Sequence, residues 1–408
     1  MDAAACPADV PPGEGHRAGE SGLRRASLAI FLAGIAVFAM LYVPQVLLPE
    51  LARAFGISSA QSTLAVSVST ASLAVGLLVL GPISDRRGRT AILHGSLAAA
   101  AGLGVLVAVA PTWSVLLGLR GVQGLALAGL PAVAAAYLRE ELHGSVSTRA
   151  IGVFVSGNAI GGLTGRLLGG LLADLGGWRA ATGGIALLGV GCAVAVRVLL
   201  PPSRRFLPMP RQGRLLRQLA AAVTDPVLLG LYGCAALLMG AFVAVYNAAT
   251  FRLESPPYGL APGLVGLVFL AYLLGSVSSV VGGELAGRFG RRLLVPVSIA
   301  VMVGGVALTL ARPLPLFVAG LCVLTGGFFA AHGVASAWVA VRAGRRGRAV
   351  GQAASLYSFW YYVGSSVGGT LAGRAWDEGG WPAVVLLASG LSVVALVVAL
   401  VLGRSRSR

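Results

Sequence analysis

The sequence contains no lysine, and charged residues of any kind are scarce in it. Only 11% of the 408 residues are charged, whereas 57% are hydrophobic. A soluble protein of this size carries roughly twice that share of charged residues, so the composition excludes an ordinary soluble domain. The apolar residues also come in long blocks instead of amphipathic stripes. We therefore expect an all-α integral membrane protein.

Cysteine is equally rare, and the usual motifs of enzymes are missing. No two of the four cysteines have the spacing of a metal or redox pair, so we expect no disulfide and no metal site. There is no G-x-S-x-G, no phosphate-binding loop and no cluster of His, Asp and Cys, which argues against an enzyme and a cofactor. The net charge of +17 would suggest nucleic acid in a soluble chain, but topology-setting arginines explain it better, and we expect no nucleic-acid partner.

Apolar runs of about bilayer length fill most of the chain. About 20 apolar residues cross a bilayer, and they must be helical because backbone polar groups in lipid need partners within the segment. Twelve spans are expected, near residues 26–48, 62–82, 90–110, 114–137, 150–172, 180–200, 226–249, 263–285, 292–311, 316–341, 349–372 and 381–402.

The polar segments divide these spans into two sets of six. The longest internal polar segment follows the sixth run and is rich in arginine. The expected organisation is a disordered cytoplasmic tail over 1–25, a six-helix bundle over 26–200, a cytoplasmic linker over 201–225, a second six-helix bundle over 226–402 and a basic tail over 403–408.

The distribution of arginine predicts the orientation. Most of the 31 basic residues fall on the side that holds both termini and the linker. Because loops rich in arginine stay in the cytoplasm, we expect a multi-pass protein of the cytoplasmic (inner) membrane with both termini inside.

The two halves of the sequence are repeats. The turn Gly81–Arg89 returns about half a chain later as Gly283–Arg291, and Asp174-x-x-Gly-Trp returns as Asp377-x-x-Gly-Trp. Each repeat has an even number of spans, so the two bundles share one orientation and should be related by a pseudo-two-fold axis along the membrane normal. A substrate site is then expected between them near the midplane.

The two repeated turns contain more glycines and charged residues than a topology signal requires. Their glycines allow unusual backbone angles, Asp85 can face the positive N-terminus of another helix, and Arg89 can pair with Glu140 or Glu141. In the second turn Gly287 replaces the acid. The alternative is a solvated turn that only sets topology. The candidate residues of the turns are Gly81, Asp85, Arg86, Gly88, Arg89, Gly283, Arg288, Gly290 and Arg291.

The first turn resembles the G-x-L-A-D-R-x-G-R signature between helices 2 and 3 of the major facilitator superfamily. Over residues 26–402 the chain is similar to its twelve-helix efflux transporters, which include drug:proton antiporters and sugar exporters. The resemblance implies that Asp85 faces the start of helix 11, near Val350. Together with the pair formed by Arg89, this contact would latch the two halves on the cytoplasmic side.

Helix 4 carries Arg120, Gln123 and Gly124, which share one helix face. They match the family's R-x-x-Q-G pattern, which the resemblance associates with proton coupling. A guanidinium inside a span is costly unless it faces a cavity or a partner. The alternative is an arginine that reaches the outer interface or pairs for structural reasons.

Helix 5 carries stripes of small residues and a second buried arginine. Asn158, Gly162 and Arg166 share a stripe, and Arg166 stands where the family's antiporter signature has its last glycine. With Arg120 at a similar depth, it predicts a positively charged outer half of the N-terminal cavity, which would suit an anionic or hydroxyl-rich substrate. The other stripe predicts close helix contact, and its members are Gly157, Gly161, Gly165 and Gly169.

No acid lies deep in any span, so few residues are left to carry a proton. The candidates are Glu50 and His332, although a lone histidine is more often structural. Polar and aromatic residues of the spans could line the cavity, or else form interfacial belts. These cavity candidates are Tyr42, Gln45, Tyr246, Asn247, Tyr357, Trp360 and Tyr361.

These features predict a secondary active transporter that works by alternating access, most simply as a proton-coupled exporter. The altered antiporter motif and the missing buried acid keep a uniporter or importer open. A membrane enzyme or a non-transporting sensor is the least favoured alternative. The expected partners are a small-molecule substrate, protons as the coupling ion and the lipid bilayer, with the protein acting as a monomer.

Overall fold

The structure is a computed structural model, and it describes residues 15–206, 223–345 and 350–404. Within these ranges the regular elements are all helices, which confirms the expected all-α class. The first half comprises α1 (Ser21–Val46), α2 (Leu48–Phe55), α3 (Ser59–Ser62), α4 (Leu64–Arg87), α5 (Arg89–Ala108), α6 (Trp113–Leu127), α7 (Gly129–Glu141) and α8 (Gly144–Leu199). The second half comprises α10 (Pro226–Glu254), α11 (Pro262–Val268), the 3-10 helix η1 (Phe269–Tyr272), α12 (Leu273–Phe289), α13 (Arg291–Leu308), α14 (Leu314–Arg345) and α15 (Val350–Arg404).

Two of the apolar helices are long enough to cross a bilayer twice. Ten helices in the described ranges have the length and hydropathy of a span, and among them α8 has 56 residues and α15 has 55. A straight helix of that length would measure about 80 Å. Both helices are broken at a glycine with positive φ, Gly177 (71°) and Gly380 (61°). Each break separates two spans, and both lie in the repeated Asp-x-x-Gly-Trp motif.

The glycine stripe of α8 lies against α1. A methyl group at Gly157, Gly161 or Gly165 would come within 2.5 Å of a backbone oxygen of α1. The second half repeats this arrangement, since Gly364 and Gly368 of α15 sit directly on the backbone of α10. Only glycine lets two helices approach so closely, and this contact builds the core of each half.

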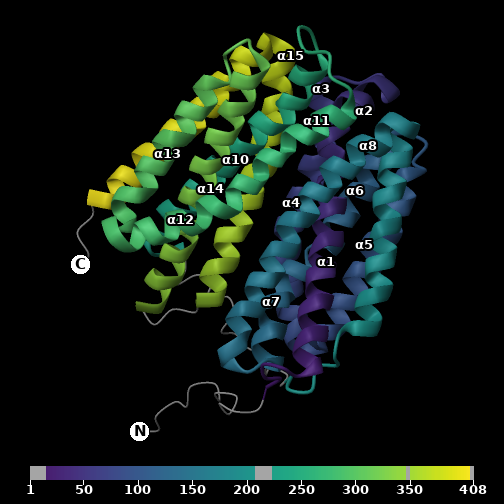
Figure 1. Cartoon of the computed structure of the whole chain (residues 1–408), viewed down its shortest axis with the longest axis vertical. Coiled ribbons are helices and arrows are strands. Elements are labelled where there is room, and N and C mark those ends of the chain that lie inside the picture. The colour runs from purple at the N-terminus through teal and green to yellow at the C-terminus, as the bar shows by residue number, and fades with distance from the viewer. Residues whose placement is uncertain (1–14, 207–222, 346–349, 405–408) are drawn as a thin grey trace.

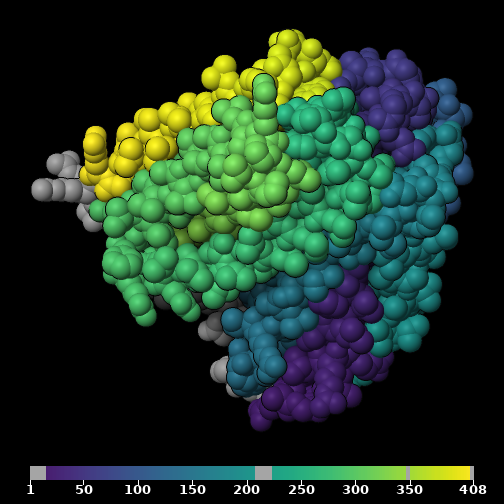
Figure 2. Space-filling model, turned by 45° about the horizontal axis from the view of Figure 1, so that its top comes forward, coloured from purple at the N-terminus to yellow at the C-terminus, as the bar shows by residue number. Residues whose placement is uncertain are grey.

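The two halves lie side by side and meet mainly through α4, α8, α11 and α15. In Figure 1 the purple-to-teal helices form one group and the green-to-yellow helices the other, with α3 and α11 together near the top of the view. Figure 2 shows the two colour groups in contact along one broad boundary. We call the end that carries the turns at Gly88 and Gly290 the basic end, and the end that carries α2, α3 and α11 the opposite end.

The expected tail over 1–25 is wrong for the residues that the structure describes. The first helix begins at Ser21, and His16 exchanges backbone hydrogen bonds of 3.1 Å with Glu141 and His143. Arg25 also donates to the carbonyl of Val198 at 3.0 Å. Polar residues that find such partners can extend the helix beyond its apolar run. Residues 1–14, most of the linker (207–222) and 405–408 lie outside the described ranges.

Candidate functional site

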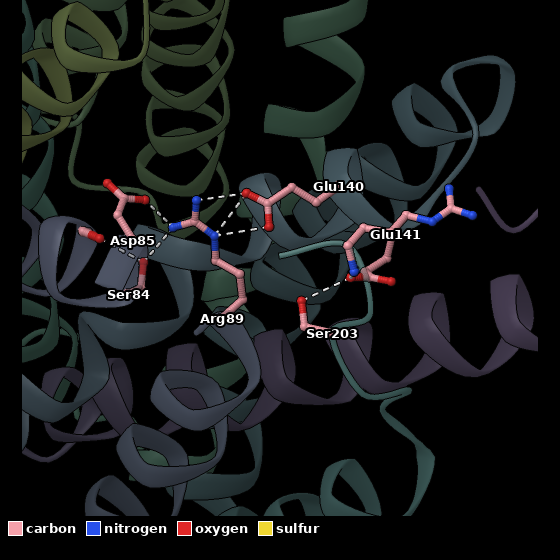
Figure 3. A network of polar contacts seen from close by, with 8 residues as sticks. Ser84, Asp85, Arg89, Glu140, Glu141 and Ser203 are labelled. Atoms are coloured by element: carbon pink, nitrogen blue, oxygen red, sulfur yellow. Dashed lines mark hydrogen bonds and ion pairs between the residues drawn. The ribbon is translucent and has the colours of Figure 1, made fainter. Parts of the chain in front are cut away.

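The turn between α4 and α5 holds a buried ion-pair network. It passes through Gly88, whose φ of 98° suits glycine and strains other residues. Arg89 is 6% exposed, and its Nε and Nη2 donate to Glu140 Oε1 at 3.0 and 2.7 Å. Its Nη1 donates to Ser84 Oγ at 2.7 Å and to the carboxylate of Asp85 (Figure 3). Charged, multiply bonded pairs of this kind are the stronger ones.

Glu141 does not take part in this network. Its Oε1 accepts from Ser203 Oγ at 2.9 Å and from the backbone N–H of Arg205 at 3.0 Å, as Figure 3 shows for Ser203. Of the two expected partners, Glu140 pairs with Arg89, while Glu141 ties the end of α7 to the start of the linker. Glu140 and Glu141 are adjacent in the sequence but point in different directions from α7, so only Glu140 contacts Arg89.

The network stays within the first half in this structure. Arg89, Asp85 and Glu140 belong to α5, α4 and α7. In the described part of the chain, no hydrogen bond of this turn reaches α15, which the latch would need. Gly81 is half-buried and Arg86 is exposed to the surroundings. A bridge between the halves at this turn is therefore not formed in this conformation.

The second turn is positive and lacks the carboxylates of the first. It passes through Gly290 (φ 84°), with Gly283 and Arg288 exposed, and the guanidinium of Arg291 lies 5.3 Å from the ring centroid of Trp338. Where the first half has Glu140, the repeat has Arg342, which donates to Asp225 at 3.0 Å.

Asp225 is the N-cap of α10 and accepts from the N–H of Val227 at 2.9 Å. Burial raises the pKa of its carboxyl, but the bonds from Arg342 and Val227 outweigh this and hold the pKa below its usual value.

Arg120 is fully engaged by the first half. It is 2% exposed, and it donates to the carbonyls of Ala65 (3.0 Å), Met40 (2.9 Å) and Leu41 (3.0 Å). It also donates to Gln123 Oε1 at 2.6 Å. The guanidinium thus joins α6 to α1 and α4 and does not reach the outer interface.

The two other residues of this motif also serve helix contacts. Gln123, which accepts from Arg120, donates in turn from its Nε2 to the carbonyl of Ala100 at 2.9 Å. Gly124 lies directly on the backbone of Ser69, where no side chain would fit. Because its donors are met by neutral acceptors, Arg120 is well placed as an internal tie between helices.

Arg166 occupies a different environment, at the boundary of the two halves. It is 2% exposed, and its guanidinium donates to Gln45 Oε1 at 2.7 Å and to Gly162 O at 2.6 Å. The Cζ atom of Arg166 lies 4.4 Å from the ring centroid of Tyr42 and 4.3 Å from that of Tyr272. The hydroxyl of Tyr272 also accepts a hydrogen bond of 3.3 Å from Arg166 Nη2. In the part of the chain that the structure describes, no carboxylate pairs with it.

The neighbours of Arg166 continue its polar path into the second half. Gln45 donates to Asn247 Oδ1 at 2.7 Å. Asn247 is fully buried, and its amide nitrogen has no partner in the described chain. Tyr272 and Phe269, which sequence reasoning missed, come from η1 and supply the second half of the aromatic cage. The one available signal was a tyrosine in an otherwise apolar span.

The remaining cavity candidates fall into two groups. Tyr246, at 1% exposed, bonds to Thr325 Oγ1 at 2.6 Å, so it lies inside and not in an interfacial belt. His332 bonds to Tyr357 at 3.0 Å and lies 4.8 Å from the ring of Tyr361.

Two candidates lie apart from these. Trp360 is 39% exposed and faces outward. Asn158 approaches Gly34 of α1 and does not join Arg166.

At the opposite end, two carboxylates join the halves reciprocally. Asp174 of α8 accepts from the N–H of Gly263 in α11 at 3.0 Å, and Asp377 of α15 accepts from the N–H of Ala60 in α3 at 2.9 Å. Both acids belong to the repeated Asp-x-x-Gly-Trp motif. The duplicated sequence therefore builds a duplicated contact, which the repeat alone did not reveal.

Further contacts strengthen the junction around this end. Arg53 of α2 pairs with Glu254 of α10 at 3.0 Å, and Ser366 of α15 donates to Ser67 O at 2.8 Å. Within the described residues no group of three or more His, Cys, Asp or Glu side chains is arranged to hold a metal ion.

Glu50 lies beside this junction, on α2 in the first half. Its Oε1 accepts from the backbone N–H of Trp178 at 2.7 Å, and its other oxygen is buried. Burial raises the pKa of its carboxyl, and the negative charge of Asp174 adds to the rise.

Comparisons with known proteins agree with this fold. The sequence model of the Major Facilitator Superfamily matches residues 30–351 and 255–408. The chain is 40% identical to the inner membrane transport protein YnfM of Escherichia coli, over 95% of this chain and 92% of that one. It is 37% identical to the uncharacterized MFS-type transporter YybF of Bacillus subtilis, over 95% and 96%.

Solved structures share the fold at much lower sequence identity. An inward-facing bacterial homologue of the human lysosomal transporter Spinster has a TM-score of 0.78 at 16% identity and covers 95% of this chain and 98% of its own. The nucleoside transporter NupG has a TM-score of 0.74 at 14% identity, with 92% and 99% covered. The chain is a multi-pass membrane transporter that belongs to the major facilitator superfamily.

Proposed function

We propose that this protein is a proton-coupled exporter of a small anionic or hydroxyl-rich solute, bound between the halves at Arg166. The carrying observation is the buried guanidinium of Arg166, which has aromatic rings and neutral oxygens around it and no carboxylate in the described chain. A buried charge without a counter-charge is costly, and an anion supplied by the substrate would remove that cost.

Asn247 supports the same substrate chemistry. Its amide nitrogen is a buried donor without a partner among the described residues, one hydrogen bond away from the residue that holds Arg166. Two donors that face the boundary between the halves favour a ligand rich in acceptor oxygens. The aromatic cage of Tyr42 and Tyr272 adds flat surfaces on which a ring could stack.

Orientation and coupling are part of this proposal. We infer a monomer in the cytoplasmic (inner) membrane with both termini inside, because arginine gathers at the basic end. The end closed by Asp174 and Asp377 would then face outward. Protons would couple through Glu50 or His332, since the spans hold no deeper acid.

A uniporter or importer of the same fold is the second candidate. It is favoured by the altered antiporter signature, in which Gly162 and Arg166 replace the proline and the last glycine of the family pattern. It differs from the first candidate in one measurable property, which is the response of transport to an imposed pH gradient.

The test is transport by the purified protein in proteoliposomes, with organic anions, sugars and cationic drugs as substrates and with or without a pH gradient. We expect Arg166→Gln to lower the transport of the preferred anion at least about tenfold, because a charge-assisted bond is lost. Arg374→Gln removes an exposed arginine of α15 and serves as the control. Equal loss in both variants would contradict the role of Arg166, and indifference to the pH gradient would favour the uniporter.

A further inference from the structure

The basic end carries an open groove in the second half, between α12 and α14. Its volume is about 460 Å³, and its floor is formed by small residues that include Ser279, Gly283, Gly287 and Gly333. A methyl group at Gly283 or Gly287 would touch no other residue, so the glycines leave a real space.

Two arginines and a tryptophan stand at the end of this groove. Arg291 and Arg345 both line it, together with Trp338, over whose ring Arg291 lies at 5.3 Å. No carboxylate lines the groove, and neither arginine forms an ion pair with a described residue. Glu284, the acid of this turn, is exposed and lies outside the lining.

The first half shows what the groove lacks. There Arg89, the repeat equivalent of Arg291, is neutralised by Glu140 and Asp85. The second half has Gly287 in place of Asp85 and Arg342 in place of Glu140. Both differences remove a carboxylate that would neutralise Arg291 beside the open space, while Arg342 itself pairs with Asp225.

The lining of the groove includes an exposed apolar side chain, and α12 exposes more outside the lining. Val341 of α14 lines the groove and is 41% exposed, while Val277 and Val280 of α12 lie outside the lining and are 61% and 64% exposed. In a membrane protein such a surface faces acyl chains. A ligand that fits an apolar slot ending at two guanidinium groups has a hydrocarbon chain and an anionic head, as an anionic phospholipid has.

We propose that the groove between α12 and α14 binds one anionic phospholipid. Its phosphate lies between Arg291 and Arg345, with the headgroup against Trp338, and one acyl chain follows the glycine floor along α12. A soluble phosphate would satisfy the arginines but would leave the slot empty. The lipid would hold α12 and α14 together beside the turn at Gly290.

Native mass spectrometry of the full chain, titrated with phosphatidylglycerol or phosphatidylcholine, tests the proposal. We expect one phosphatidylglycerol to remain bound at concentrations at which phosphatidylcholine does not. Arg291→Gln with Arg345→Gln should weaken phosphatidylglycerol binding about 10- to 30-fold, since each arginine near an anionic membrane surface strengthens binding about fivefold. The control, Arg288→Gln with Arg292→Gln, removes the same charge from exposed positions outside the lining.

A second variant tests the slot without touching the charges. Gly287→Leu fills the floor where the structure has free space, and it should also weaken phosphatidylglycerol binding. Equal affinity for the two lipids, or an equal loss in the control variant, would overturn the proposal. Competition by glycerol phosphate as effective as that of the lipid would overturn it too, because the site would then recognise only an anion.

Discussion

The two ends of the boundary between the halves differ in whether their polar contacts cross from one half to the other. At the opposite end, Asp174 and Asp377 each accept from a backbone N–H of the other half. At the basic end, the network of ion pairs and hydrogen bonds around Arg89 is confined to the first half. Reciprocal hydrogen bonds therefore close the opposite end, whereas the charged groups of the first turn at the basic end bond, among the described residues, only within the first half.

This difference bears on how the protein changes conformation. An alternating-access transporter exchanges contacts at one end for contacts at the other. The opposite end is the same in both repeats, since each repeat supplies the aspartate of its Asp-x-x-Gly-Trp motif. The basic end departs from it, since Asp85 has Gly287 as its counterpart. We infer that closure of the basic end depends on the first turn alone, whereas closure of the opposite end is shared.

The largest effect is expected from removing both acids of the opposite end. Asp174→Ala with Asp377→Ala deletes two charge-assisted bonds to backbone N–H groups, each worth about 1 kcal/mol. The population should shift about 30-fold away from the closed opposite end. Spin labels at Ala54→Cys in α2 and Leu264→Cys in α11, both exposed positions, would report a longer distance across the halves.

Glu378→Ala provides the matched control for this experiment. It removes an exposed acid next to Asp377 that forms no ion pair with a described residue. The distance between the labels should stay as in the parent protein. If the double variant and this control behave alike, the reciprocal bonds do not hold the end closed.

A smaller shift in the opposite direction is expected from Asp85→Asn. In the other conformation Asp85 is predicted to face the start of α15, and loss of its charge there costs about 1 kcal/mol. In the present conformation its partner is Arg89, which keeps Glu140 as well, so less is lost. The same spin labels should report about a fivefold gain of the closed opposite end, together with slower transport. A shift in the direction of the double Asp→Ala variant would contradict the latch.

The sequence was informative about contacts between helices of the same half. The glycine stripe of α8 predicted close helix contact from its spacing, and the expected topology put Glu140 and Glu141 at the same end as Arg89. The cage around Arg166 could not be predicted, because Tyr272 comes from the other half, and periodicity carries no information about contacts across a movable boundary. The reciprocal bonds of Asp174 and Asp377 escaped for the same reason, although their motif was visible as a repeat.

The smallest effect concerns Glu50, which lies beside the closed end. Burial raises the pKa of its carboxyl above the ordinary value of 4.5, so the protonated form is favoured in the folded protein. Its contribution to stability is thus fully present below pH 4.5 and is lost as the pH rises through the raised value. Glu50→Gln resembles the protonated form at every pH. The midpoint of thermal unfolding of the variant should therefore match that of the parent at about pH 4 and exceed it slightly at about pH 7.

This experiment separates the burial of Glu50 from its hydrogen bond. The N–H of Trp178 donates to the carboxylate and opposes the effect of burial. If that bond dominates, Glu50→Gln will lower the unfolding midpoint at about pH 7 instead of raising it. Glu378→Gln supplies the exposed control, for which no such pH-dependent difference is expected. A rise confined to Glu50→Gln would show that burial of the Glu50 carboxylate outweighs its hydrogen bond from Trp178 in the folded protein.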